Sequence, residues 1–173
     1  LEEHDAAHVA PEEAEKCVMD FVGDYDQVPP MYSALKINGK KLYELAREGK
    51  TVERKSRRVT IYDIQITDVN IPEISMEVNC SKGTYIRTLC QDIGDRLGVG
   101  ACMKTLLRTR VGHFDISGSI RLDEVEEKVR SGRLNEMLIP LDAVFADLDR
   151  AVIADRYASL AYNGNPVFEK NLQ

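Results

Sequence analysis

A strand, a glycine turn and a helix follow one another across Cys80–Cys90, and this stretch constrains the fold of the chain more than any other. The apolar residues before it alternate from Ile74 to Cys80, which is typical of a half-buried strand. Gly83 marks a tight turn, and apolar residues at helical spacing follow it. The pattern therefore predicts a helix that begins with Tyr85 and Arg87. An aromatic ring and a fixed cation at that point suit a planar, partly anionic ligand such as a nucleotide.

Other segments indicate a mixed α+β class. The double proline 29–30 and the turn Ile37–Gly39 interrupt regular structure. Asn70 and Pro72 mark the connection between the strand that starts at Arg57 and the strand from Ile74 to Cys80. The other predicted elements are helices over 11–22, 41–48 (with Gly49 as its C-cap), 101–107 and around 122–129, and strands over 32–36, from Arg57 to Ile66, and over 108–116.

Composition excludes several classes of protein. No apolar run approaches the ~20 residues that a membrane-spanning helix needs, and the acidic N-terminal region is unlike a signal peptide. The four cysteines, Cys17, Cys80, Cys90 and Cys102, form no C-x-x-C pair. We therefore expect reduced thiols in a cytoplasmic protein.

The net charge of −6 is unevenly distributed. Residues 1–26 carry nine acidic side chains and one basic side chain, whereas residues 36–58 carry nine basic and three acidic ones. Residues 82–110 are also basic, with six Lys or Arg and two Asp. An acidic protein with two basic stretches binds nucleic acid if the fold places them on one face, and otherwise carries them as an ordinary solvated surface.

Cations in these stretches are candidate phosphate ligands, which add salt-dependent affinity and no sequence preference. Those predicted to contact RNA are Lys36, Lys40, Lys41, Arg47, Lys82 and Arg108, and Arg54, Lys55, Arg57 and Arg58 are further candidates. Tyr32, which follows the rigid Pro29-Pro30 pair, is either a stacking platform for an unstacked base or an ordinary core tyrosine. Arg87 at a helix start needs an anionic partner, either a ligand or a structural carboxylate such as Asp92 or Asp95.

His4 and His8 have the i, i+4 spacing of a zinc-protease helix, with Asp5 where such helices have Glu. No third ligand is evident and Pro11 lies close behind. A metal hydrolase is therefore a weak alternative, and we expect no metal site.

Several long motifs occur in one order along the chain. They are Pro29-Pro-Met-Tyr-Ser-Ala-Leu-Lys36, Gly39, Leu42-Tyr-Glu-Leu-Ala-Arg-Glu-Gly49, Cys80-Ser-Lys-Gly-Thr-Tyr-Ile-Arg87, Asp92-Ile-Gly94, Leu97-Gly98 and Leu106-Leu-Arg-Thr-Arg-Val-Gly112. Between about residues 17 and 145 the chain resembles the bacterial tRNA pseudouridine synthase B family. The resemblance implies a partial pseudouridine synthase fold, with a mixed, mainly antiparallel sheet flanked by helices.

The resemblance also implies a reaction. Enzymes of this family isomerise one uridine in the T loop of tRNA to pseudouridine, without cofactor or metal. An aspartate attacks the flipped uridine, the glycosidic bond breaks, the base rotates and a carbon–carbon bond forms. Flipping is required because the reacting atoms are inaccessible in the stacked loop. The implied partner is the T-arm stem-loop of tRNA.

Roles follow by motif. Tyr32 resembles the ring that stacks on the target base and takes part in proton transfer, and Tyr85 resembles the second aromatic wall. Arg87 is similar to the arginine that pairs with the catalytic aspartate, and Leu106 matches a leucine that packs on the uridine. The family's nucleophile lies in a Gly-x-Leu-Asp segment upstream of the proline–tyrosine motif, and nothing in the first 28 residues matches it.

We therefore expect residues 1–149 to be the C-terminal part of the catalytic domain, without its nucleophile and inactive alone. Residues 150–173 are expected to begin a truncated RNA-binding appendage. An exposed sheet edge in such a fragment predicts pairing between two copies. The alternative is an RNA-binding module without catalytic activity.

Overall fold

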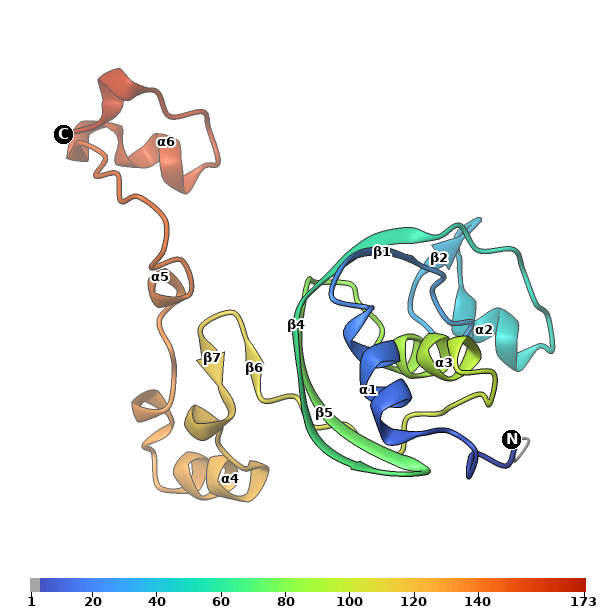
Figure 1. Cartoon of the computed structure of the whole chain (residues 1–173). Coiled ribbons are helices and arrows are strands. Elements are labelled where there is room, and N and C mark those ends of the chain that lie inside the picture. The colour runs from blue at the N-terminus through green and yellow to red at the C-terminus, as the bar shows by residue number, and fades with distance from the viewer. Residues whose placement is uncertain (1–3) are drawn as a thin grey trace. The chain divides into compact units, whose positions relative to one another are not determined.

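A computed structural model describes residues 4–173, which divide into two compact units between Leu107 and Arg108. The first unit contains a three-stranded sheet and its helices, and the second contains short elements only (Figure 1). Helices and antiparallel strands together confirm the predicted α+β class. In the described residues no helix combines the length and the apolar character needed to cross a bilayer.

The sheet of the first unit has the strand order β1-β4-β5 and is antiparallel throughout. Its strands are β1 (Gly23–Gln27), β4 (Arg57–Asn70) and β5 (Glu73–Cys80). The first residues of β4 pair with β1, from Gln27 opposite Arg57 to Gly23 opposite Ile61, and β5 pairs with β4 from Ile61 onward. Two register shifts in β4 accompany a strong curve of β4 and β5 around the helices (Figure 1).

Helices α1 (Pro11–Met19) and α3 (Ile86–Arg96) lie inside this curve (Figure 1). Pro11 begins α1, where its missing N–H costs nothing. The two helices and β4 share one core, formed by the buried side chains Cys17, Val18, Phe21, Ile61, Ile64, Leu89 and Ile93. This core fixes the start of α3 relative to the sheet.

Two short strands, β2 (Lys36–Ile37) and β3 (Lys40–Lys41), form a hairpin ahead of α2 (Leu42–Arg47). Asn38 and Gly39 both have positive φ, 51° and 82°, as the tight turn predicted there requires. The predicted helix over 41–48 is also confirmed, as Leu42–Arg47; Glu48 is its C-cap, and Gly49 follows with a φ of 72°.

Three predicted elements are wrong. Of the predicted strand 32–36 only Lys36 is in a strand, β2; residues 32–34 form bends and Leu35 is irregular, because carbonyls of this segment bond to Arg87 and to α2 in place of a neighbouring strand. Residues 101–107 have no regular structure, although their apolar spacing is helical. The strand over 108–116 is instead a hairpin of β6 (Arg110–Val111) and β7 (Phe114–Asp115), which Gly112 turns with a φ of 57°.

Strand β1 of the main sheet was not predicted. Helix α1 ends at Met19, three residues before the predicted end at residue 22, and β1 begins directly after that point, at Gly23. Asp24 and Asp26 of β1 are exposed and Gln27 is buried, so the strand lacks the alternating apolar residues by which a strand is usually recognised. This polar pattern concealed the strand.

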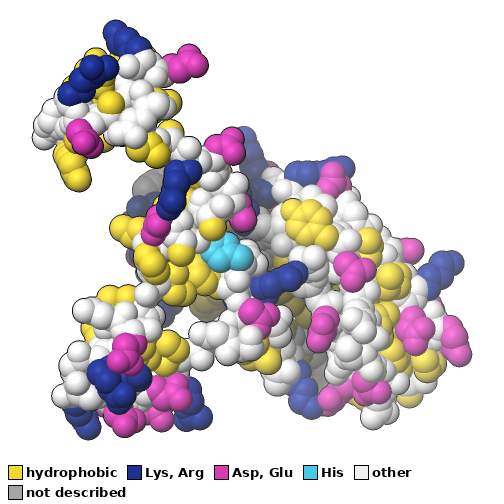
Figure 2. Space-filling view, turned by 90° about the vertical axis from the view of Figure 1, so that its left-hand side faces the viewer, with side chains coloured by type: hydrophobic (Ala, Val, Ile, Leu, Met, Phe, Trp, Pro, Cys, Tyr) yellow, Lys and Arg dark blue, Asp and Glu magenta, His cyan; other side chains and the backbone are white. Residues whose placement is uncertain are grey.

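The second unit contains α4 (Leu122–Arg130), α5 (Leu141–Val144), α6 (Ala158–Tyr162) and short 3-10 turns. Within the described chain, no residue from 108 to 170 is buried. Leu122 and Leu141 are 85% and 82% exposed. Figure 2 shows hydrophobic side chains at the surface among cations and carboxylates. This unit therefore has little apolar core of its own.

Candidate nucleic-acid interface

The loop that follows β1 is held by hydrogen bonds to its main-chain carbonyls. The Tyr32 carbonyl accepts from Arg87 Nη2 at 2.8 Å, and the Pro29 carbonyl accepts from Arg54 Nη1 at 3.0 Å. The Ser33 and Leu35 carbonyls accept from main-chain N–H groups of α2, at 3.1 and 2.8 Å. Because these bonds fix the main chain, the Tyr32 ring is held with 59% of the residue exposed. Tyr32 is thus an exposed ring, and the core-tyrosine alternative is wrong.

Arg54 was a candidate phosphate ligand and has a different place in the structure. Its Nη1 atom donates to the Pro29 carbonyl, and its Nε atom is buried without a hydrogen-bond partner among the described residues. Arg54 is half-buried, and its guanidinium therefore supports the main chain of this loop.

Tyr85 stands immediately before α3 as its N-cap, with extended backbone and no side-chain cap of its own. The turn ahead of it is tied to β4, since Ser81 N–H donates to Thr60 O at 2.8 Å and Thr60 N–H donates to Ser81 Oγ at 3.0 Å. Gly83 adopts a φ of 88° in this turn. The strand, turn and helix predicted over Cys80–Cys90 are therefore confirmed, with Tyr85 half-buried at the helix start.

Gln27, the last residue of β1, contacts the main chain of Tyr85. Tyr85 N–H donates to Gln27 Oε1 at 2.8 Å, and Gln27 Nε2 donates to Tyr85 O at 3.1 Å. Gln27 Nε2 also donates to the Tyr25 hydroxyl. The Tyr25 ring packs edge-on against Phe21 at 5.4 Å, and burial raises the pKa of Tyr25 to about 12. This hydroxyl is therefore a neutral hydrogen-bond partner at physiological pH.

Arg87 forms no ion pair with Asp92 or Asp95 among the described residues, so the structural-carboxylate alternative is not observed. The Arg87 side chain is exposed and bonds the Tyr32 carbonyl across 55 positions of sequence. Burial and, to a smaller extent, the Asp95 carboxylate raise the pKa of Asp92. The structure thus brings Tyr32 and Arg87 together near the start of α3, where Tyr85 lies.

Leu106 is 56% exposed in the irregular segment after α3. Arg108 is exposed and belongs to the second unit.

Some of the predicted phosphate ligands already contact side chains of the protein. Lys40 lies 3.6 Å from Glu48, and Lys41 Nζ donates to the Tyr43 hydroxyl at 3.2 Å. The Arg47 guanidinium lies over the Tyr43 ring at 5.3 Å. Lys36 and Lys82 are exposed, and no ion pair occupies them within residues 4–173. These two lysines are thus the predicted phosphate ligands of the first unit that are exposed and in no ion pair.

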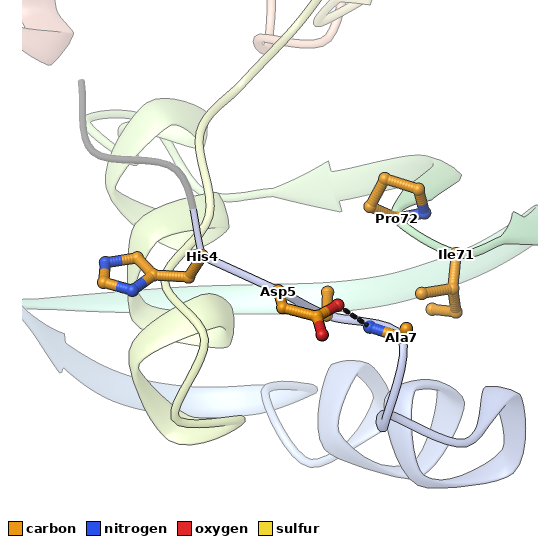
Figure 3. Close-up of a pocket in the computed structure, with 6 residues that line it drawn as sticks. His4, Asp5, Ala7, Ile71 and Pro72 are labelled. Atoms are coloured by element: carbon orange, nitrogen blue, oxygen red, sulfur yellow. Dashed lines mark hydrogen bonds between the residues drawn. The ribbon is translucent and has the colours of Figure 1, made fainter.

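The histidines do not form the helical face on which the metal-hydrolase alternative depended. His4 lies in irregular chain and His8 in a turn, and the described residues hold no cluster of three or more His, Cys, Asp or Glu side chains with metal-site geometry. His4 and Asp5 line an open hollow of about 410 Å³ together with Ala6, Ala7, Ile71 and Pro72. The Asp5 carboxylate there accepts from Ala7 N–H at 2.9 Å, and the His4 ring points away from Ile71 and Pro72 (Figure 3).

Sequence reasoning missed Gln27 and Tyr43. Gln27 lies directly before Val28-Pro29-Pro30, next to a motif that the sequence analysis used. Its burial was not predicted, because glutamine side chains are normally exposed. Tyr43 lies among cations, and this arrangement of an aromatic ring with Lys41 and Arg47 was the available signal.

Two family models match consecutive parts of the chain. The TruB family pseudouridylate synthase N-terminal domain matches residues 1–86, and the tRNA pseudouridylate synthase B C-terminal domain matches residues 87–152. Proteins called tRNA pseudouridine synthase B are similar over most of the chain. That of Lachnoclostridium phytofermentans is 48% identical over 162 residues, which are 89% of this chain and 53% of the relative. That of Clostridium tetani is 44% identical over 172 residues, 99% of this chain and 58% of the relative.

The chain therefore spans about half the length of the curated relatives it matches. Among solved structures, a chain of a Cbf5-Nop10-Gar1 complex is similar with a TM-score of 0.74 and 24% identity, over 98% of this chain and 49% of that one. This likeness shows the fold alone. Family models over residues 1–152 and relatives with 44–48% identity agree with the ordered motifs and the fold. The chain belongs to the TruB family of pseudouridylate synthases.

Proposed function

We propose that this chain forms the uridine pocket of a tRNA pseudouridine synthase that isomerises the T-loop uridine of tRNA. The observation that supports this most is the 2.8 Å bond from Arg87 to the Tyr32 carbonyl. It holds an exposed aromatic ring near the helix start that carries Tyr85. A flipped base needs stacking surfaces held in advance, and two aromatic residues on fixed main chain supply them.

In the proposed reaction the bond between N1 of uracil and C1′ of ribose breaks. The base rotates, and C5 bonds to C1′. The C5 hydrogen leaves as a proton and N1 gains a proton, so the reaction needs no oxidant or cofactor. Tyr32 stacks on the base and assists the proton transfer at C5. Arg87 pairs with the attacking aspartate, and Leu106 covers the bound uridine.

Isomerisation is tested by tritium release from 5-tritiated uridine in a T-arm stem-loop, because only C5 attachment expels that hydrogen. The chain is assayed alone and then with a second polypeptide that carries a Gly-x-Leu-Asp segment of the family. Release that appears only on mixing supports the proposal. Release by the chain alone assigns the nucleophile to an aspartate within it. Salt-dependent RNA binding without release, by a correctly assembled mixture, favours the RNA-binding module without catalytic activity.

RNA contact in this proposal uses Lys36 and Lys82 first, since both are exposed, have no ion pair within residues 4–173 and belong to the same unit as Tyr32 and Arg87. Lys40, Lys41, Arg47 and Arg108 contribute as secondary contacts. The proposed setting is the cytoplasm, consistent with four cysteines that form no disulfide in the described chain. The boundary near residue 149, beyond which an RNA-binding appendage would begin, stays a prediction.

A pairing of two copies is also proposed. Strands β1 and β5 are the edge strands of the described sheet, and edge strands present main-chain groups to another chain. Light scattering at rising protein concentration measures the mass. A constant monomer mass would contradict the pairing.

A further inference from the structure

The Gln27 side chain uses its hydrogen-bonding capacity on two tyrosines. Its amide oxygen accepts from Tyr85 N–H at 2.8 Å, and its amide nitrogen donates to Tyr85 O at 3.1 Å and to the Tyr25 hydroxyl. Only 1% of Gln27 is exposed. The pair of bonds to Tyr85 reproduces the exchange between two paired strand residues, but a side chain takes the part of one strand.

These bonds satisfy groups that a helix start leaves open. The first N–H groups of a helix have no intrahelical partner, and Tyr85 has no side-chain cap. The Tyr85 carbonyl already accepts from Thr88 and Leu89 N–H at 3.0 Å, and Gln27 adds a third donor. The amide thus anchors the main chain of Tyr85, and both of its bonds to this residue go to main-chain atoms.

Gln27 also begins the loop that carries the other aromatic wall. It is the last residue of β1, paired with Arg57, and the chain runs from it through Val28 and Pro29 to Tyr32. One buried residue therefore joins the start of the Tyr32 loop to the main chain of Tyr85.

We propose that Gln27 is a positioning residue of the uridine pocket, which sets the separation of the Tyr32 and Tyr85 rings so that one base fits between them. This proposal rests on the proposed function for its ligand, a flipped pyrimidine base. Only a side-chain amide meets the requirement, because the site needs one acceptor and two donors. A carboxylate lacks the donors and an alkyl group lacks both.

Residue-resolved hydrogen exchange tests the anchor without any RNA. In the unaltered chain the Tyr85 N–H should be protected, although the first N–H groups of a helix usually exchange quickly. Gln27→Ala should speed Tyr85 exchange about fivefold or more, as expected for one lost hydrogen bond, while the Ile93 N–H within α3 keeps its rate. The matched control is Gln91→Ala, which removes an exposed amide from the same helix and should change neither rate. An unprotected Tyr85 N–H in the unaltered chain would overturn the anchor even if Gln27→Ala does not fold.

Binding of two RNA stem-loops tests the positioning. One carries the T-loop uridine and the other an abasic site at the same place, and the ratio of their Kd values isolates the base. The unaltered chain should favour the uridine about 5- to 160-fold, the range expected for stacking of one base. Gln27→Ala should lower this ratio and leave the abasic Kd within about twofold, whereas a purely structural role would move both Kd values together.

Tyr25→Phe provides a second, milder variant that keeps both bonds to Tyr85 and removes the partner that orients the amide. It should lower the uridine ratio by less than Gln27→Ala does. A ratio unchanged in both variants, with Tyr85 exchange accelerated, would overturn the positioning role. A ratio of one in the unaltered chain would overturn the pocket itself, and normal Tyr85 protection would then locate the failure in the proposed function and not in the anchor.

Discussion

Arg87 Nη2 donates a 2.8 Å hydrogen bond to the main-chain carbonyl of Tyr32, and these residues lie 55 positions apart in the sequence. The bond joins the first turn of α3 to the proline-rich loop. It fixes the main chain of Tyr32 and leaves the ring exposed.

Replacing Arg87 with alanine removes this tie. Because Arg87 is exposed and its partner is a carbonyl, we expect a loss of about 1 kcal/mol in the free energy of unfolding, within the range for one hydrogen bond. Uridine-dependent RNA binding should fall with it, since the loop gains freedom. Urea unfolding measures the free energy of unfolding, and the uridine-to-abasic Kd ratio measures the uridine-dependent binding. Arg87→Lys keeps the charge, so full binding in that variant would assign Arg87 a charge role only.

Tyr32→Ala should leave stability within about 0.5 kcal/mol, as is usual for an exposed position. It should weaken binding of the uridine stem-loop by about 1–3 kcal/mol, the contribution of one stacked base. Tyr62→Ala is the matched control, because Tyr62 is 60% exposed and Tyr32 is 59% exposed. Equal losses of RNA binding in the two variants would remove Tyr32 from the pocket.

Gly94→Ala should destabilise the first unit. A Cβ at Gly94 would lie 2.1 Å from Ala101 N and 2.3 Å from Gly100 C, so α3 and the segment after it must separate. Overpacking of this kind typically costs about 1–3 kcal/mol. Gly118→Ala is the control, since its added Cβ meets nothing within 4 Å. Thermal unfolding compares the two, and equal melting temperatures would contradict the close packing.

Asp92→Asn should stabilise the protein at neutral pH. Burial raises the pKa of Asp92 above its usual 3.8, so the folded state holds the proton more tightly than the unfolded state. The ionised carboxylate therefore opposes folding, and this opposition grows as pH rises from 3.8 through the raised folded pKa. The melting temperature of Asp92→Asn should exceed that of the unaltered protein at pH 7, and the difference should shrink toward pH 4. Asp63→Asn, at an exposed position of β4, is the matched control.

RNA binding should depend on salt through Lys36 and Lys82. Each phosphate contact contributes roughly 0.7–0.9 to the slope of log K against log salt concentration. Replacing both lysines with alanine should lower the slope by roughly twice that amount if both contact phosphates. Lys104→Ala is the control, because Lys104 already pairs with Glu73. An unchanged slope in the double variant would place the RNA on another face.

The sequence by itself determined the family, the α+β class, and the position of Tyr85 and Arg87 at a helix start. Those conclusions rest on local signals, namely ordered motifs, the period-two runs of β4 and β5, and the glycine turn before α3. Each such signal lies within a few residues, where backbone preference and apolar spacing decide the structure.

Only the tertiary structure decided how the pocket is held together. The partners of Gln27 and Arg87 lie 58 and 55 positions away, and a hydrogen bond between distant residues leaves no trace in local spacing. For the same reason the polar strand β1, whose partner is β4, was concealed, and the segment 32–36 was assigned wrongly, because its carbonyls bond to Arg87 and α2. The segment 108–116 was assigned wrongly for a local reason, since Gly112 turns it back on itself as the hairpin of β6 and β7.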